Sequence, residues 1–177
     1  MKYKIVTSGK TKVVTLAEIS RNLKVSSEIY ALSDKEIYLG PVYHKTLVFF
    51  SVEFAHYALQ NYTKKNIPEA EICIHLTRKW LEDRESVSNE QLIAAANAAY
   101  AANAANAANA AYHANSAAAN SAAIAAAYSS YAPAHAANAA YAAYAADAAG
   151  VYGDKEFIRQ GNFILDFLKS GKNLFLV

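Results

Sequence analysis

The sequence predicts a mainly α-helical protein, in which an alanine-rich antiparallel helical bundle follows a small N-terminal α/β subdomain made of a hairpin plus a helix. Almost every residue from 91 to 150 is Ala, Asn, Tyr or Ser, and neither Gly nor Pro occurs from Ser88 to Ala132. Alanine is the best helix former, so this segment favours helix. Residues 1–68 have mixed composition, with ten Lys/Arg against five Asp/Glu. We therefore predict a small basic α/β subdomain over 1–52 and a helical domain over 53–177.

The N-terminal subdomain is expected to begin with a β-hairpin. Residues 3–7 and 12–15 are rich in β-branched side chains, and Ser8-Gly9 supplies a turn between them. Apolar residues at helical spacing predict a helix over 16–23. The other elements expected here are a turn and helix start at 25–28 and strands over 37–41 and 46–52.

The helical domain is expected to begin with two ordinary helices, over 54–62 and 69–83, the second with Pro68 in its first turn. Ser88 and Gln91 form a capping-box pattern that starts the alanine-rich core helices over 88–149. A single helix over 88–132 would be about 65 Å long, which is too long for a compact domain of this size. We expect a break near 113–116, a new start at Pro133 and an end at Gly150.

Composition and motifs exclude several classes of protein. The net charge is +2, too small for nucleic-acid binding over the whole surface. The Ala-Ala-Asn repeats lack the apolarity of a membrane span, and the N-terminus lacks the apolar region of a signal peptide. Cys73 is the only cysteine and is expected to be buried in a cytoplasmic protein. No HExxH, CxxC, GxSxG or GxxxxGK[ST] pattern occurs, so we predict no catalytic residue, metal site or cofactor.

Three stretches carry a resemblance to a known family. They are residues 67–81, with Pro68 before a helix that ends in Arg78-Lys79-Trp80-Leu81; residues 91–99, which enter the alanine helices; and residues 131–142, with His135 and Tyr141. Together they resemble the Imm5-like immunity proteins of bacteria and their phages. Where that family spaces Arg and His along its helices, this chain has Asn and Tyr. The resemblance implies a helical cytosolic protein that neutralises an effector by binding it.

The leading functional hypothesis is a non-catalytic protein-binding inhibitor of the immunity or phage anti-defence type. Its partner would be a bacterial effector, toxin or defence protein. Tyrosine is enriched in interfaces, because it offers a large area with few rotatable bonds. We place the partner-binding patch at Tyr128, Tyr131, His135 and Tyr141. The alternative is that these rings fill gaps in an alanine core. The oligomeric state is left open.

A second hypothesis is a nucleic-acid-binding regulator that uses the N-terminal module. Residues 16–30 are similar to a helix-turn-helix segment, with Ser20 where the helices would cross and a turn at Val25-Ser26. Recognition would then use a short set of residues, namely Arg21, Lys24, Ser26 and Ser27, with Glu28 beside them at a major groove. The alternative for this segment is an ordinary α/β subdomain. A third hypothesis is a small-ligand pocket between the helices, lined by Tyr and Asn.

Overall fold

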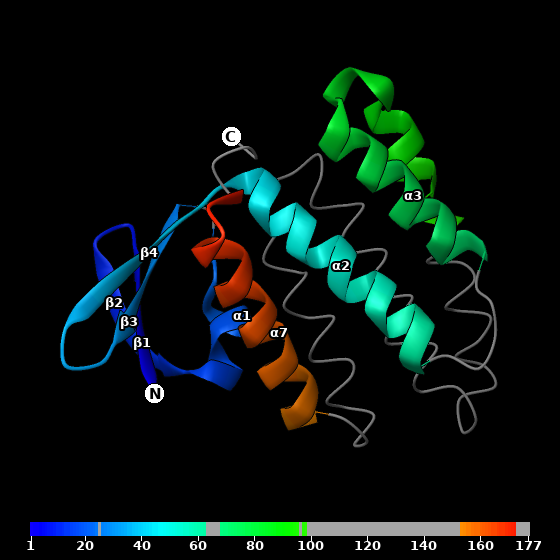
Figure 1. The fold of residues 1–177 in the computed structure, drawn as a ribbon. Coiled ribbons are helices and arrows are strands. Elements are labelled where there is room, and N and C mark those ends of the chain that lie inside the picture. Colours follow the sequence, from blue (N-terminus) through cyan, green and yellow to red (C-terminus); the bar gives the residue numbers. More distant parts are fainter. Residues whose placement is uncertain (25, 63–67, 96, 99–152, 173–177) are drawn as a thin grey trace.

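The computed structural model describes residues 1–24, 26–62, 68–95, 97–98 and 153–172, and these form an antiparallel sheet with helices on one of its faces (Figure 1). The strands are β1 (Lys2–Thr7), β2 (Lys10–Thr15), β3 (Ser27–Leu32) and β4 (Glu36–Val42). The helical elements are η1 (Leu16–Glu18), α1 (Ile19–Asn22), α2 (His44–Tyr62), α3 (Pro68–Glu82), η2 (Arg84–Ser86) and α7 (Gly153–Lys169). Residues 89–95 and 97–98 are also helical.

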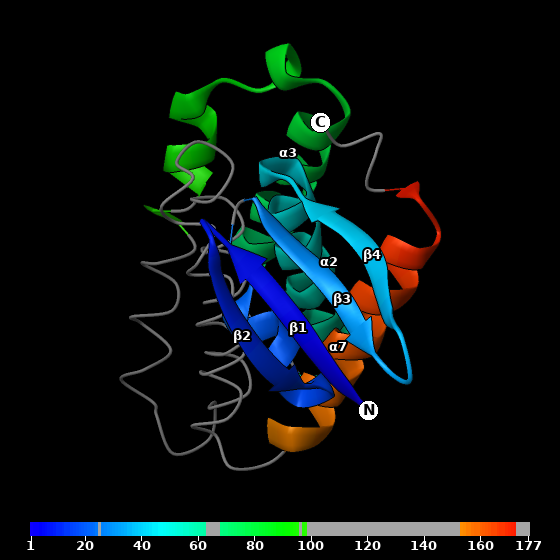
Figure 2. The ribbon, with the colours of Figure 1, turned by 90° about the vertical axis from the view of Figure 1, so that its left-hand side faces the viewer.

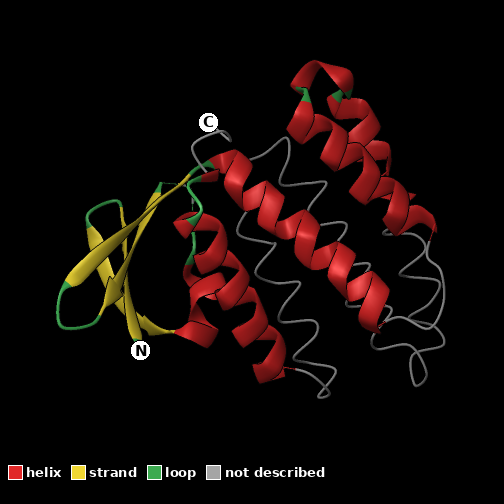
Figure 3. Cartoon of the chain, in the orientation of Figure 1, coloured by secondary structure: helices red, strands yellow, loops and turns green. Residues whose placement is uncertain are grey.

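The prediction of a mainly α-helical bundle is wrong. The chain folds as an α+β structure around a four-stranded sheet of order β2-β1-β3-β4, in which all neighbouring strands are antiparallel (Figure 3). The prediction followed the alanine-rich stretch, because that stretch dominates the composition. The sheet is specified instead by short alternating segments before residue 43. In β3 the buried and part-buried residues alternate over the whole strand, which is the period of a half-buried strand.

The predicted hairpin is confirmed. β1 pairs with β2, and the two turn residues Ser8 and Gly9 have φ angles of 50° and 75°. Two positive φ angles in a two-residue turn match the right-handed twist of the flanking strands. The helix expected over 16–23 is confirmed as η1 followed by α1, and the strand expected over 37–41 lies within β4.

Two local predictions are wrong. The helix start expected at 25–28 is a turn at Ser26, with a φ of 63°, followed by β3. The strand expected over 46–52 is part of α2. Leu47, Phe50 and Phe54 are buried at helical spacing in the core against the sheet, and Val48 is buried in a second cluster with Trp80. Packing on two sides of α2 therefore overrides the β preference of its Val and Phe residues.

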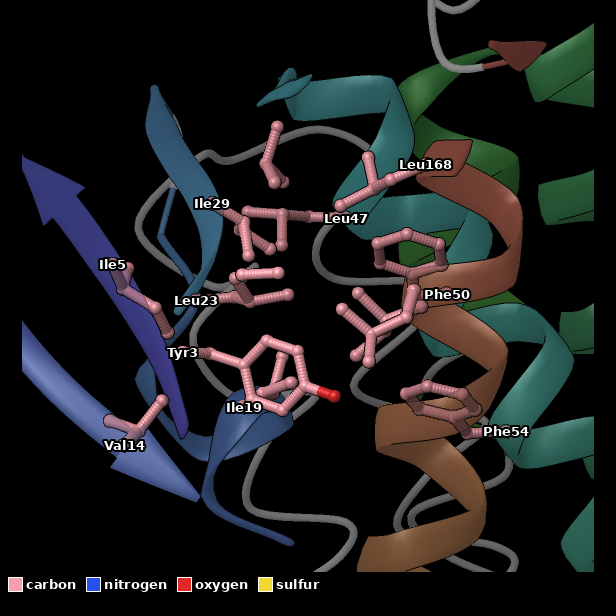
Figure 4. Close-up of a cluster of buried hydrophobic side chains, with 14 residues drawn as sticks. Tyr3, Ile5, Val14, Ile19, Leu23, Ile29, Leu47, Phe50, Phe54 and Leu168 are labelled. Carbon is pink, nitrogen blue, oxygen red and sulfur yellow. The ribbon is translucent and has the colours of Figure 1, made fainter. Parts of the chain in front are cut away.

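The main core lies between the sheet and two helices, α2 and α7 (Figure 4). The strands contribute Tyr3, Ile5 and Ile29, and α2 contributes Phe50 and Phe54. The aromatic rings of α2 also contact those of α7, with Phe49 and Phe167 centroids 4.8 Å apart. The boundary predicted at residue 52 falls inside α2, and this core contains residues from both sides of it.

α3 confirms the helix predicted after Pro68, and its buried side contains Ala70, Cys73, Ile74, Thr77 and Trp80. The capping box at the next helix is also confirmed. Ser88 N donates to Gln91 Oε1 at 2.9 Å, and Gln91 N donates to Ser88 Oγ at 3.3 Å. The rest of the predicted alanine-rich bundle, from residue 99 to 149, lies outside the described residues. Among the helices that are described, none has the length and apolarity to cross a membrane.

Cys73 is fully buried, as predicted, and its environment leads to a pH prediction. Burial raises the pKa of its thiol from 9.0 to about 12. The unfolded thiol ionises first as pH rises, so the stability that the buried neutral thiol contributes is present below about pH 9 and is lost between pH 9 and 12. We expect the free energy of unfolding to fall between pH 9 and 11 by about 1.4 kcal/mol per pH unit more in the wild type than in Cys73→Ala.

Urea unfolding at several pH values measures this difference, and the comparison cancels the Tyr and Lys ionisations that both proteins share. The same burial predicts that a thiol reagent labels Cys73 at pH 8 only after unfolding. The prediction is contradicted if the free energy of unfolding changes with pH in parallel for the two proteins. It is also contradicted if the reagent labels Cys73 rapidly in the folded protein.

Candidate binding surfaces

The residues placed in a partner-binding patch, namely Tyr128, Tyr131, His135 and Tyr141, lie outside the described residues. Of the second set, Lys24 and Ser26 are exposed, whereas Ser27 is buried at the start of β3. Ser27 Oγ lies 2.6 Å from Thr7 Oγ1 and accepts a 2.9 Å hydrogen bond from Lys24 N. Arg21 belongs to the four-residue helix α1. The helix-turn-helix interpretation is wrong, because a strand stands where the recognition helix is required.

The sheet has an outer face, away from the helices, that carries a row of four side chains from its four strands. In an antiparallel sheet, residues directly opposite one another point to the same side. Lys4 of β1 pairs with Val13 of β2 and with Tyr30 of β3, and Tyr30 pairs with Tyr38 of β4. Their neighbours along the strands, such as Ile5 and Ile29, point into the core. We call Val13, Lys4, Tyr30 and Tyr38, with Glu28 and Glu36, the outer sheet face. Figure 2 views the sheet from this side, with the helices behind it.

The central ring of the outer sheet face is held from several directions. The ring centroids of Tyr30 and Tyr38 are 5.1 Å apart, and Lys4 Nζ lies 4.1 Å from the Tyr30 centroid. Tyr30 Oη donates to Glu28 Oε2 at 2.9 Å, and Lys4 forms an ion pair with Glu36. The hydrogen bond to Glu28, together with burial, raises the pKa of the Tyr30 phenol. Burial raises the pKa of the Tyr38 phenol. Both phenols therefore stay protonated at neutral pH. The Tyr30 O–H is donated to Glu28, and the Tyr38 O–H can be donated to a partner.

The outer sheet face combines apolar area with fixed polar groups. Val13 is 53% exposed and Tyr38 is 51% exposed. Groups of this kind can contact the surface of another molecule: ring faces, a phenol donor and paired charges. Within the described part of the chain, no three His, Cys, Asp or Glu side chains form a group that could hold a metal ion.

Sequence reasoning missed the outer sheet face, although a signal for it exists. Residues 27–32 alternate strictly between the two sides of β3, but an alternation does not tell which side is buried until the pairing of β3 with β1 is known. In the helix-turn-helix interpretation, residue 30 belongs to the second helix and not to a strand.

A second polar group lies on α7 and contacts α2 through Arg159. Glu156 is 4% exposed, and Arg159 donates to both of its carboxylate oxygens at 2.8 and 2.6 Å. Gln160 Nε2 donates to Glu156 Oε1 at 3.0 Å, while Gln160 Oε1 has no hydrogen-bond partner. The Arg159 guanidinium lies 3.6 Å from the centroid of the Tyr57 ring. Because this cluster links α7 to α2, we interpret it as a contact that stabilises the fold.

Comparison with known proteins gives no relative: no family model, no curated protein and no solved structure matches the chain.

Proposed function

We propose that the protein is a non-catalytic protein-binding inhibitor of the immunity or anti-defence type, which neutralises a bacterial effector by direct binding. The observation that supports it best is the outer sheet face. The solvated side of an antiparallel sheet usually carries polar residues. Here that side presents Tyr38, which contacts the Tyr30 ring, and Val13 on the other side of Lys4, and each is about half exposed.

The composition of the outer sheet face fits a protein partner. Tyrosine is enriched among the residues that dominate interface energies, and it loses little side-chain entropy on binding. The Tyr30 ring is already fixed by Lys4, Glu28 and Tyr38, so less ordering is needed when a partner docks. Lys4, Glu28 and Glu36 supply both signs of charge around the rings, which suits the polar rim of an interface.

Substitution of Tyr38 by Ala tests the proposal, with Ile72→Ala as the matched control. Ile72 is 53% exposed on α3, away from the sheet. The partner is first identified by photo-crosslinking from position 38 in the source cell and then purified. We expect wild-type protein to inhibit the partner's activity at a stoichiometric ratio. Tyr38→Ala should weaken binding by about 30-fold, which corresponds to about 2 kcal/mol, and Ile72→Ala should bind as the wild type does.

Two results contradict the proposal. The first is a crosslinked partner whose activity does not change at saturating protein. The second is equal binding by Tyr38→Ala and the wild type while the partner is still inhibited, which would remove the outer sheet face from the interface. Thermal melting of each variant shows whether a loss of binding comes from a loss of folding.

A further inference from the structure

Lysines from separate elements meet at one corner of the sheet. Thr7, at the end of β1, pairs with Lys10 of β2. The Thr7 hydroxyl lies 2.6 Å from Ser27 Oγ, which in turn accepts a hydrogen bond from Lys24 N. Lys10 points to the same side of the sheet as Thr7, because paired residues share a side. The loop that carries Lys24 therefore lies on one side of Thr7, and Lys10 lies on the other side of it.

Two further lysines extend this corner. Lys12 lies two residues after Lys10 on the same side of β2, and its Nζ donates to Asn22 Oδ1 at 2.5 Å. Ser26 N donates to Val42 O at 2.9 Å, and α2 begins two residues after Val42 with Lys45 in its first turn. We call Lys10, Lys12, Lys24 and Lys45 the basic corner. Figure 2 shows the β1–β2 turn, the start of β3 and the end of β4 at the same end of the sheet.

The N-terminus of α2 adds positive potential to the basic corner. A helix N-terminus is equivalent to roughly half a positive charge, and α2 has 19 residues. Lys10, Lys12 and Lys24 are exposed, so their ammonium groups reach solvent.

The acidic side chains of the first 52 residues lie elsewhere. Glu18 accepts a hydrogen bond from Thr15 N, and Thr15 pairs with Lys2 at the opposite end of the sheet. Asp34 and Glu36 lie in or next to the β3–β4 turn at that same opposite end. The fourth acid, Glu28, is part of the outer sheet face. The basic corner therefore has no acidic side chain of the first 52 residues beside its lysines, whereas Lys2 and Lys35 lie at the end of the sheet that carries the acids.

The polar groups of the basic corner favour phosphate over a protein surface. Its other side chains include Ser8, Asn22 and Ser26, and none of its described residues is a large exposed apolar one. Contacts to phosphate oxygens come from Lys, Ser, Thr and Asn side chains and from backbone N–H groups. Protein interfaces are depleted of Lys and Ser and rely on an apolar or aromatic centre, which this protein has on the outer sheet face instead.

We propose that the basic corner binds the phosphodiester backbone of nucleic acid without reading its sequence. The charge complementarity of four gathered lysines with a polyanion, together with the hydroxyl and amide groups between them, carries this inference. It requires no recognition helix. It is also independent of the proposed inhibitor function, because it uses residues outside the outer sheet face.

The test is fluorescence anisotropy with a labelled 20-nucleotide single strand and its duplex, at ~50 and ~200 mM salt. The variant Lys10→Gln/Lys24→Gln removes two charges from the basic corner. The control Lys2→Gln/Lys35→Gln removes two exposed charges from the opposite end of the sheet. We expect wild-type binding that weakens steeply with salt. The corner variant should bind about tenfold more weakly at ~50 mM salt, with a log–log salt slope reduced by about 1.4 on the single strand, and the control should change binding less than twofold.

Three outcomes overturn the proposal. One is no binding by the wild-type protein at ~50 mM salt. Another is an equal loss in the two double variants, which would mean that only overall charge matters. The third is equally tight binding of a polyglutamate of matched length, which would identify an acidic polypeptide as the ligand. Neither substitution touches a buried residue, and unchanged melting temperatures confirm that the variants fold.

Discussion

Gly161→Ala is expected to lower the free energy of unfolding by about 2 kcal/mol, although alanine favours helix and Gly161 is inside α7. A Cβ atom at this position would lie 2.4 Å from Leu16 O and 2.9 Å from Leu16 Cδ1. The oxygen belongs to the backbone of η1, so it cannot rotate away as a side chain can. Overpacking of this kind costs about 3 kcal/mol at the upper end, and the gain in helix propensity offsets about 1 kcal/mol of it.

Thermal unfolding measures this effect, and Asn162→Ala is the control because Asn162 is the exposed next residue of the same helix. For a chain of this size, a loss of 2 kcal/mol lowers Tm by about 4 to 8 °C. An unchanged or raised Tm for Gly161→Ala contradicts the close approach of α7 to η1.

Gly161 illustrates what the sequence could not predict. The close contact joins two segments about 145 residues apart in the chain, and no local pattern indicates it. The elements that were predicted correctly carry their own local signals. Ser8-Gly9 accommodates a turn with positive φ angles, Pro68 starts a helix, and Ser88 with Gln91 caps one.

The errors arose where tertiary packing outweighs local preference. Residues 46–52 have the composition of a strand, but α2 is buried between the sheet core and α3, where both of its sides are apolar. Residues 16–30 have apolar spacing that suits two helices. The second half of this segment instead forms β3, which pairs with β1. A single sequence does not reveal this contact between distant segments.

The candidate surfaces depend on the same missing information. The outer sheet face needs the register that places Lys4 opposite both Val13 and Tyr30. The basic corner needs the strand pairing and the hydrogen bonds that place Lys10 and the Lys24 loop on either side of Thr7. The sequence does show an excess of positive charge before residue 68, but the separation of Lys10, Lys12 and Lys24 from the acids at the other end of the sheet appears only in the folded chain.

Arg159→Met is expected to be the most destabilising of the substitutions considered, with a loss of about 3 to 5 kcal/mol in the free energy of unfolding. Glu156 is 4% exposed and receives two hydrogen bonds from Arg159. Methionine keeps the apolar stem of the side chain but leaves the carboxylate buried without its guanidinium partner. The stacking of the guanidinium on the Tyr57 ring is lost as well.

The double substitution Glu156→Met/Arg159→Met distinguishes the contribution of the ion pair to stability from the contribution of side-chain packing. Removing both charges from such a pair is often nearly neutral, so the double variant should recover about half of the lost stability. The rest stays lost, because the buried Gln160 Nε2 no longer has Glu156 Oε1 as its acceptor, which costs about 1 to 3 kcal/mol. Arg78→Met is the matched control, because Arg78 pairs with Glu53 in a more exposed setting and should cost at most about 1 kcal/mol. Urea unfolding of the four proteins completes the comparison. If the double variant is as unstable as Arg159→Met alone, the loss comes from packing of the arginine stem and its ring contact, and the buried charge is not its cause.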